Sequence, residues 1–438
     1  LMCQALTAGE FDEMKPPFVT RGSRIRPIVA FGLALIALFL VFGILSWRAA
    51  PTSLAQENPD MAFLPIQHAP VPTPTPVPTP TPPPTPTPGP PPQFVQNITL
   101  PNALCPNAAG FNQVSGYIYV LNNFSNNVSV FRERTFLTDI ATGEWPTDVA
   151  SDPASARTWV TNLHSGVSLL QGTSQIALVP PAREPYGVTF NPINGYVYAS
   201  DLDSKVQIIN GSQEVTTLDL IDPETGRGAG WMRPIVADPQ TGLVYVASWD
   251  YGRLYVIEDT HVAGSVRIGW GPLNMAIDSS RHVLYVAHSD PNTDYPHDIS
   301  VVNLNNLSVT FVNPIPSEIN RARDVAVDPI SGLAYFTNPN QNTVTVLSGT
   351  NVVGTVAVGK QPWGIGVNPN DGYVFVTNRE SHDVSILRNG ILMDTVATQG
   401  KSPFAVGVDT NNNDIYIVNR GEGENANNCK KASVSILH

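Results

Sequence analysis

The chain is short of charge, and short of basic residues in particular. Only 14% of its 438 residues are charged, and 24 Lys and Arg stand against 36 Asp and Glu, for a formal charge of -12. Proteins that bind nucleic acid need a basic surface against the phosphates. The composition therefore argues against DNA and RNA as partners.

Cysteine is also scarce, and the usual catalytic motifs are missing. The three cysteines, Cys3, Cys105 and Cys429, are too few for a disulfide scaffold and lack the CxxC spacing of a structural zinc site. The eight histidines form no HExxH motif, and no GxSxG motif occurs. Folding must then rest on apolar burial, and no common hydrolase signature is present.

One long apolar segment interrupts the polar N-terminal region. Residues 28–47 carry no charge and are rich in Leu, Ile, Val, Phe and Ala, enough for a helix to cross about 30 Å of hydrocarbon. Basic residues precede the segment, at Lys15, Arg21, Arg24 and Arg26. The positive-inside rule predicts a single-pass plasma-membrane protein with residues 1–27 in the cytoplasm and the remainder outside.

A cleaved signal peptide is the alternative interpretation of this segment. Small residues at Ala49, Ala50 and Ala55 are compatible with processing. The apolar run is longer than a usual signal core, which favours an uncleaved anchor.

Residues 48–93 form a linker rich in Pro and Thr. Between 70 and 92, Thr-Pro and Pro-Pro pairs dominate, and proline fixes φ and removes the amide donor. We expect extended polyproline II, which spaces the following domain from the membrane at about 3.1 Å per residue. A docking site for a proline-recognising partner and an O-glycosylated stalk are the alternatives.

Residues 94–438 are built from repeats. Each repeat has an Asn or Asp seven residues before an aromatic, and a short β-like tetrapeptide begins at that aromatic. The eight anchor aromatics are Tyr119, Trp159, Tyr198, Tyr245, Tyr285, Tyr335, Phe375 and Tyr416. Their intervals run from 39 to 50 residues. A period of roughly 40 to 45 residues with four short strands is typical of a β-propeller blade.

Turn and strand signals inside the repeats agree with this prediction. Asn194-Gly195 and Asp371-Gly372 are hairpin dipeptides, because Gly accepts the positive φ of two-residue turns. The anchor aromatic then alternates with small or β-branched residues, a pattern that predicts a half-buried strand. Two further strands follow in each repeat.

The tetrapeptides resemble those of the YVTN β-propeller repeat family, and the resemblance covers residues 94–438. Five copies have the family's Asn, at Asn122, Asn162, Asn338, Asn378 and Asn419, whereas three depart from it, with Asp201, Ser248 and His288. The resemblance implies an all-β propeller. It does not imply one activity, because this architecture serves scaffolds, receptors, lyases, lactonases and dehydrogenases.

We expect eight four-stranded blades, with residues 94–100 completing the last one. The chain ends at His438, after the third strand of the eighth repeat, so the N-terminal strand should close the ring and cover its open edge. Seven blades is the alternative, if the first repeat is degenerate. Cys105 and Cys429 then fall on connections of one face, where a disulfide could lock the closure, the alternative being two unpaired buried thiols.

Four insertions break the regularity, and all belong to one face of the propeller. Residues 288–298 and 420–431 join second to third strands, and residues 222–231 and 313–323 join a fourth strand to the next blade. We call this the insertion face and expect it to bind a ligand, with the mouth of the central channel in it. The alternative is that the insertions are neutral surface loops.

Candidate site residues lie on this face. The ligand-binding candidates are Asp290, Asp294, Tyr295, His297, Tyr186, Trp231, Trp363, Phe404, Arg321 and Arg323. Asp290, Asn292 and Asp294 have the alternating oxygens of a calcium loop, but Tyr295 stands where an EF-hand has Gly. His288, His297 and Asp298 are the acid-base candidates.

Together these features favour a membrane-anchored, extracytoplasmic binding or scaffold module for a cell-envelope protein or glycan. Calcium is the one cofactor that the sequence suggests. An extracytoplasmic enzyme of the propeller lyase or lactonase type is the first alternative, and a structural component of the cell envelope is the second.

Overall fold

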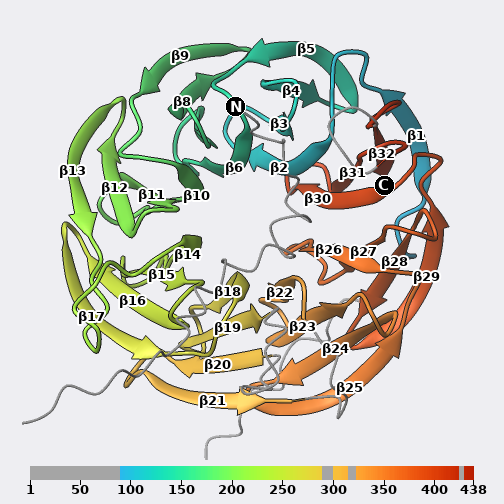
Figure 1. Ribbon diagram of the computed structural model, residues 1–438. Coiled ribbons are helices and arrows are strands. Elements are labelled where there is room, and N and C mark those ends of the chain that lie inside the picture. Colours follow the sequence, from blue (N-terminus) through green and yellow to red (C-terminus); the bar gives the residue numbers. More distant parts are fainter. Residues whose placement is uncertain (1–88, 289–298, 314–321, 424–428) are drawn as a thin grey trace, which may run out of the picture. The chain divides into compact units, whose positions relative to one another are not determined.

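The computed structural model describes residues 89–288, 299–313, 322–423 and 429–438, and in these the protein is an eight-bladed β-propeller (Figure 1). Each blade is a four-stranded antiparallel sheet. The predicted fold class and blade number are confirmed, and the seven-blade alternative is wrong. The predicted transmembrane helix and most of the linker lie outside the described residues, among which no helix is long and apolar enough to cross a membrane.

The first strand of each blade lies nearest the axis, and the second strand follows it outward (Figure 1). The inner strands are β2 (Pro106–Asn112), β6 (Pro146–Ser151), β10 (Pro185–Phe190), β14 (Met232–Ala237), β18 (Pro272–Asp278), β22 (Val325–Val327), β26 (Pro362–Val367) and β30 (Pro403–Asp409). The second strands are β3 (Tyr117–Asn122), β7 (Arg157–Asn162), β11 (Tyr196–Asp201), β15 (Val244–Ser248), β19 (Val283–His288), β23 (Leu333–Asn338), β27 (Val374–Asn378) and β31 (Asp414–Asn419).

The third and outer strands complete the blades. The third strands are β4 (Asn127–Arg132), β8 (Gly166–Gln171), β12 (Lys205–Asn210), β16 (Arg253–Glu258), β20 (Ile299–Asn303), β24 (Thr343–Ser348), β28 (Asp383–Arg388) and β32 (Ser433–Leu437). The outer strands are β5 (Thr135–Ala141), β9 (Ser174–Val179), β13 (Gln213–Asp219), β17 (His261–Arg267), β21 (Ser308–Val312), β25 (Asn351–Ala357), β29 (Ile391–Ala397) and β1 (Phe94–Thr99).

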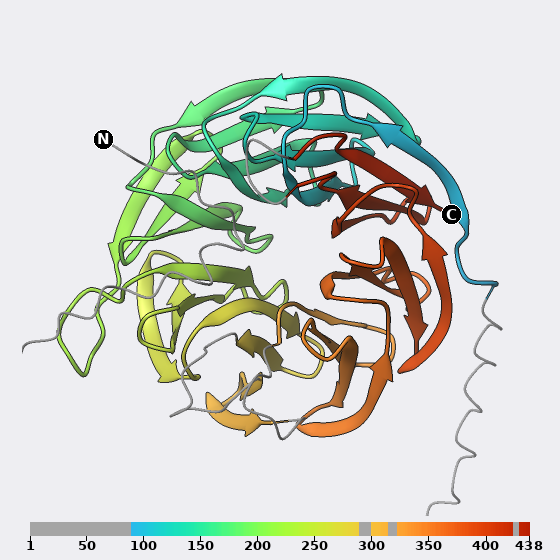
Figure 2. The ribbon, with the colours of Figure 1, turned by 45° about the vertical axis from the view of Figure 1, so that its right-hand side comes forward.

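The N-terminal strand closes the ring, as the sequence predicts. β1 is the outer strand of blade 8 and pairs antiparallel with β32, with Ile98 opposite Val434 (Figure 2). Just before β1, the backbones of Gln93 and His438 exchange two hydrogen bonds of 2.9 Å. Blade 8 is thus made from both ends of the repeat array, which leaves no blade without its outer strand.

In the described part of the chain, the core is divided into eight apolar clusters, one between each pair of neighbouring blades. In the cluster between blades 1 and 2, Tyr119 and Val130 pack with Val160 and Leu170. The cluster between blades 8 and 1 likewise spans the closure. Because a blade packs on both of its faces, most residues of the second and third strands are buried. The prediction that the second strand is half-buried is therefore wrong. It assumed that one face of the strand is exposed to solvent, whereas both faces pack against neighbouring blades.

The repeated Asn has a structural role within the blade. Its side-chain amide donates to a hydroxyl on the third strand, as from Asn122 to Ser129 at 2.8 Å and from Asn378 to Ser385 at 2.9 Å. In blade 5 the same position holds His288, whose Nε2 lies 2.8 Å from Ser300 Oγ. The Asn position thus ties the second strand to the third, and a different side chain can do the same.

The anchor aromatics connect each blade to the next. Five of them bond the backbone of the turn between the third and outer strands of the neighbouring blade. Tyr119, Trp159 and Tyr198 donate to the carbonyls of Gly172, Gly211 and Asp259 at 2.9 Å, and the hydroxyls of Tyr335 and Tyr416 accept from the amides of Gly390 and Arg134 at 3.0 Å. The Tyr416 bond crosses the closure from blade 8 to blade 1.

The ring closure also explains why blade 7 has Phe375 instead of Tyr. The equivalent partner would be a turn between the third and outer strands of blade 8. That blade takes its outer strand from residues 94–99, so no hairpin joins β32 to β1. A buried hydroxyl at this position would lack the backbone partner that five of the other anchors have.

A disulfide joins Cys105 and Cys429, the pair expected from the sequence. Their Cα atoms lie 5.2 Å apart and both side chains are fully buried. Cys105 follows β1 and Cys429 precedes β32, so the bond links the segments next to the closing strand pair.

The bond between blades can be tested with Tyr119→Phe, which keeps the ring and removes the hydroxyl. We expect the free energy of unfolding in urea to fall by about 1 kcal/mol, because the Gly172 carbonyl loses the hydrogen bond that the Tyr119 hydroxyl donates to it. Tyr119→Leu, which also loses ring packing, should cost several-fold more. Equal stability of wild type and Tyr119→Phe would contradict a stabilising role for the bond.

Candidate functional site

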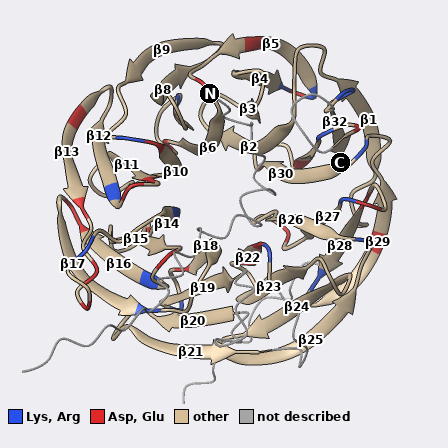
Figure 3. Ribbon diagram, viewed as in Figure 1, with Lys and Arg blue, Asp and Glu red and all other residues tan. Residues whose placement is uncertain are grey.

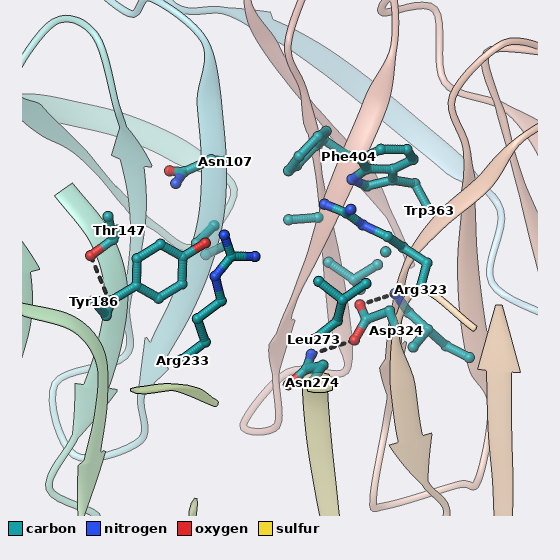
Figure 4. Close-up of a pocket in the computed structure, with 16 residues that line it drawn as sticks. Asn107, Thr147, Tyr186, Arg233, Leu273, Asn274, Arg323, Asp324, Trp363 and Phe404 are labelled. Atoms are coloured by element: carbon teal, nitrogen blue, oxygen red, sulfur yellow. Dashed lines mark hydrogen bonds between the residues drawn. The ribbon is translucent and has the colours of Figure 1, made fainter. Parts of the chain in front are cut away.

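A cavity of about 280 Å³ lies on the propeller axis, at the end where the inner strands begin. Every blade contributes one residue at an equivalent position (Figure 4). These residues, which we call the mouth ring, are Asn107, Thr147, Tyr186, Arg233, Leu273, Arg323, Trp363 and Phe404. They follow the connections between blades, which places the cavity on the insertion face.

Local sequence sets the direction of the mouth-ring side chains. In six blades the preceding residue is Pro, which begins the inner strand, while blades 4 and 6 have Met232 and Ala322 there. The ladder to the second strand then shifts register, for example between Pro106 and Ala108 and between Pro362 and Ile365. Such a bulge leaves one residue unpaired and re-aims its side chain.

Glycine follows two of the mouth-ring aromatics because the inner strands are close together there. A Cβ on Gly187 would lie 2.5 Å from the Arg233 carbonyl oxygen, and a Cβ on Gly364 would clash with the Phe404 carbonyl. The Pro-Tyr-Gly and Pro-Trp-Gly sequences thus let neighbouring inner strands approach at the cavity.

On one side of the cavity, Arg233 is held among aromatic rings. Its guanidinium Cζ lies 4.2 Å from the centre of the Trp249 ring and 5.6 Å from that of Tyr186, with Trp231 at 5.5 Å. The residue is only 3% exposed. Arg233 therefore presents its charge to the cavity from a fixed position.

On the other side, Arg323 stacks on Trp363, with Cζ 3.9 Å from the ring centre (Figure 4). Arg379 lies over Trp363 at 5.0 Å, and Arg420 over Phe404 at 4.8 Å. The Trp363 and Phe404 rings are themselves 5.5 Å apart. Guanidinium groups and aromatic faces thus flank the cavity from two opposite directions.

A repeat-level pattern underlies these contacts. In three blades, the mouth-ring residue and the residue 16 positions later form an Arg–aromatic pair, namely Arg233 with Trp249, Trp363 with Arg379, and Phe404 with Arg420. In blade 4 the Arg is the mouth-ring residue, whereas in blades 7 and 8 the aromatic residue is. Sequence reasoning missed Arg233, Arg379 and Arg420, although an alignment of the repeats at these two positions would have found them.

Two carboxylates occupy the position after the mouth ring. Asp324 accepts hydrogen bonds from the amides of Val325 and Ile365, at 2.8 and 3.1 Å, and from Asn274. Asp148 accepts from Val149 and Val188 in the same way, at 2.8 and 3.0 Å. Each carboxylate therefore joins its own inner strand to that of the next blade.

Burial outweighs these hydrogen bonds in the titration of both groups. Loss of solvation raises the pKa of Asp148 to about 6 and raises the pKa of Asp324, although the amide donors favour the ionised forms. The charge of Asp148, on β6, therefore changes near pH 6.

Four of the predicted ligand-binding residues line this cavity: Tyr186, Trp363, Phe404 and Arg323. A fifth, Trp231, is not among the residues that line the cavity but contacts Arg233, which is. His288, a candidate for acid-base chemistry, is instead 1% exposed inside blade 5, with Nδ1 2.9 Å from the Trp270 carbonyl oxygen. The other candidates, Asp290, Asn292, Asp294, Tyr295, His297, Asp298 and Arg321, lie outside the described residues.

One insertion is described in full, and ion pairs hold it in place. Arg253 is 6% exposed and bonds Asp222 at 3.2 Å and Glu224 at 2.5 Å, while Arg267 also pairs with Glu224. Residues 222–231, which end at Trp231, therefore form a fixed part of the insertion face next to Arg233.

No group of three or more His, Cys, Asp or Glu that could hold a metal ion occurs among the described residues. The calcium candidates fall outside them, so calcium binding stays a prediction.

Comparisons with known proteins add little to the description of the site. No family model matches the chain, and no curated protein matches it. Among solved structures, a similar chain is hydrazine synthase from Kuenenia stuttgartiensis, with a TM-score of 0.47 and 14% identity over 73% of this chain and 93% of that one. A likeness of this size has no bearing on function.

The raised pKa of Asp148 predicts a pH-dependent stability. Between the ordinary value of 3.8 and about 6, the unfolded chain releases this proton while the folded protein keeps it, so the contribution of Asp148 to stability falls as pH rises through this window. Asp148→Asn should remove about 1–3 kcal/mol of that loss, measured by urea unfolding at pH 4 and pH 7. Both proteins keep the pH dependence of the other shifted carboxyl groups, which include Asp201, whose pKa is also raised to about 6, and Asp238, whose pKa is lowered. If wild type and Asp148→Asn show the same pH dependence of stability, the raised pKa of Asp148 is contradicted.

Proposed function

We propose that this protein is a membrane-anchored, extracytoplasmic binding module that captures a protein or glycan ligand at the channel mouth on its insertion face. In this proposal, residues 28–47 anchor the chain and the Pro/Thr-rich linker holds the propeller away from the membrane. A rigid ring of blades presents its loops in fixed positions, which suits recognition.

The observation that carries the proposal is the mouth ring. One side chain from each of the eight blades converges on a single cavity, and four of these side chains are aromatic or Arg residues predicted as ligand contacts. Pockets with aromatic walls and a few fixed polar groups are typical binding sites. A regular array needs no Arg–aromatic pairs for its fold, because the other blades have Asn107, Thr147 and Leu273 at the same position.

The composition of the cavity favours binding over acid-base catalysis. Of the described residues that line it, Asp324 is the one carboxylate, and none is His. Asp324 is engaged by backbone amides and by Asn274. A lyase or lactonase mechanism through His288 would need a side chain that reaches solvent, whereas this one is enclosed in its blade.

A binding screen of residues 89–438 against envelope proteins and a glycan panel tests the proposal. This fragment contains all the strands of the ring and its closure, and it keeps the hydrogen bond from Tyr373 to the Gly89 carbonyl. We expect a ligand whose binding is lost on deletion of residues 290–297 or in Arg323→Gln. The control is Ile330→Ser, in a hairpin on the opposite face, which should bind like wild type. Failure to bind any panel member, or equal loss in the control, would contradict the proposal.

A specific feature also favours the structural alternative, in which the propeller packs through its blade sides. The outer strands carry no Lys and expose apolar side chains all round the ring, and most of their length is uncharged (Figure 3). Those side chains are Val95, Leu137, Ile176, Leu178, Val215, Val262, Phe311, Val352, Val353, Ile391, Leu392 and Met393. Uncharged apolar edge strands promote association between sheets.

The densest part of this apolar belt lies on the adjacent outer strands β25 and β29. If the belt mediates lateral packing, the fragment should self-associate as its concentration rises, measured by sedimentation velocity. A triple variant with Lys at positions 353, 391 and 393, which replaces side chains 46–63% exposed, should remain monomeric. Ile330→Lys, on a hairpin instead of an outer strand, is the matched control. A wild-type fragment that is monomeric throughout would count against this function.

A further inference from the structure

Two polar groups on the cavity wall have no hydrogen-bond partner within the described part of the chain. They are the Tyr186 hydroxyl and the Trp363 indole N–H, and both residues are partly exposed. Tyr186 lies on β10 and Trp363 on β26, and the two side chains line the cavity from opposite sides (Figure 4). A ligand in the cavity therefore meets one polar aromatic edge on each side.

The backbone of Tyr186 is held by the preceding blade. The Tyr186 carbonyl accepts a hydrogen bond of 2.9 Å from the Thr161 hydroxyl, and the Asp148 carboxyl group accepts one of 3.0 Å from the Val188 amide. Asp148 and Thr161 belong to blade 2, whereas Tyr186 belongs to blade 3. Tyr186 thus projects from a backbone position that two blades fix.

Trp363 is held in the same way on the other side of the cavity. Its carbonyl accepts a hydrogen bond of 3.0 Å from the Thr337 hydroxyl, and Asp324 accepts one of 3.1 Å from the Ile365 amide. The two aromatic residues are therefore positioned by equivalent contacts. Side chains that are fixed before the ligand arrives are suited to orienting it.

The ring of Trp363 is already packed against other side chains. Arg323 and Arg379 place their Cζ atoms 3.9 and 5.0 Å from its centre, and these contacts hold the ring in orientation. The group of Trp363 that a ligand can engage is the indole N–H at the ring edge. In this arrangement the arginines support the aromatic ring, and the ligand needs no hydrogen bond from them.

The Asn and Asp side chains of the lining offer few acceptors to a ligand. Asn107 Oδ1 is buried, and Asn274 Oδ1 accepts a hydrogen bond of 2.8 Å from a backbone amide. Asp324 accepts from two backbone amides and from the Asn274 side chain. The Trp363 indole can only donate. The cavity therefore suits a ligand that supplies acceptors and has few donors of its own.

An extended proline-rich peptide has this chemistry. Proline has no backbone N–H but keeps its carbonyl, and the polyproline II conformation leaves the carbonyls without internal partners. Aromatic-lined sites recognise such segments in several classes of binding domain. A glycan fits less well, because its hydroxyls also donate and would need acceptors from the cavity.

The propeller already makes one contact of this kind. The Tyr373 hydroxyl donates a hydrogen bond of 2.7 Å to the carbonyl of Gly89, which forms the peptide bond to Pro90. Pro91 and Pro92 follow and are partly buried. A tyrosine hydroxyl of this protein thus binds a carbonyl that directly precedes a proline.

We infer that the ligand of the mouth ring is a protein, bound through an extended proline-rich segment whose carbonyl oxygens accept hydrogen bonds from the Trp363 indole and the Tyr186 hydroxyl. This inference rests on the proposed function, because it names the ligand class of the same site. It selects the protein ligand of that proposal in place of the glycan.

Calorimetric titration of residues 89–438 tests the inference. This fragment keeps the described strands of the ring and lacks residues 48–88 of the Pro/Thr-rich linker, which would compete with the probe. The probe is a capped peptide with the sequence of residues 70–88, and its matched control has Ala in place of every Pro. We expect the probe to bind at least about tenfold more tightly than the control, because the Ala peptide adds amide donors and loses more backbone freedom on binding.

Variants test the two donors separately. Tyr186→Phe and Trp363→Phe each remove one donor and keep an aromatic ring. Each should weaken binding of the probe by about fivefold, as expected for the loss of one hydrogen bond, and the double variant should weaken it further. The control is Tyr251→Phe, which removes a hydroxyl from the β15–β16 connection of the same face, outside the cavity lining.

Two outcomes would overturn the inference: a probe that binds no more tightly than the Ala peptide, or a double variant that binds the probe like wild type. Circular dichroism and urea unfolding check that each variant is folded, and Tyr186→Phe alone decides the test if Trp363→Phe is not. Neither outcome affects the proposed function if the wider panel yields a glycan or another protein ligand. If the panel yields none, the proposed function fails as well.

Discussion

Contact between neighbouring blades is the interaction on which this protein depends. Among the residues that the structure describes, each apolar cluster is shared by two blades, so no blade has a core of its own there. The anchor aromatics mark these contacts in the sequence, and the polar groups of five of them bond the turn of the next blade. Every blade therefore needs two neighbours, and the array is stable as a closed ring.

Closure imposes its own requirements on the sequence. β1 must pair with β32, the disulfide joins the flanking segments, and Tyr416 must reach the Arg134 amide across the junction. At the one interface without a hairpin turn, the anchor is Phe375. Such departures from the repeat follow from hydrogen-bond satisfaction and need no functional explanation.

The mouth of the channel departs from the repeat for a different reason. Its side chains sit at equivalent backbone positions, so the fold fixes where they point but not what they are. Three blades use these positions for Arg–aromatic pairs, and others have Asn107, Thr147 or Leu273. At such positions the side chain can differ from blade to blade and set ligand specificity, while the backbone of the ring stays the same.

The sequence by itself determined the blade number, the strand order and the closing strand, because these follow from the spacing of the anchor aromatics and from hairpin dipeptides such as Asp371-Gly372. It also identified Tyr186, Arg323, Trp363 and Phe404 as residues of one face. Only the tertiary structure decided that these side chains meet Arg233 in one cavity, since that depends on how eight blades tilt around an axis. It also showed that His288 is buried, because this side chain bonds Ser300 and the Trp270 carbonyl inside the protein. The periodicity of the sequence predicts which strands pair within a blade. The convergence of eight inner strands on one cavity is a property of the closed ring.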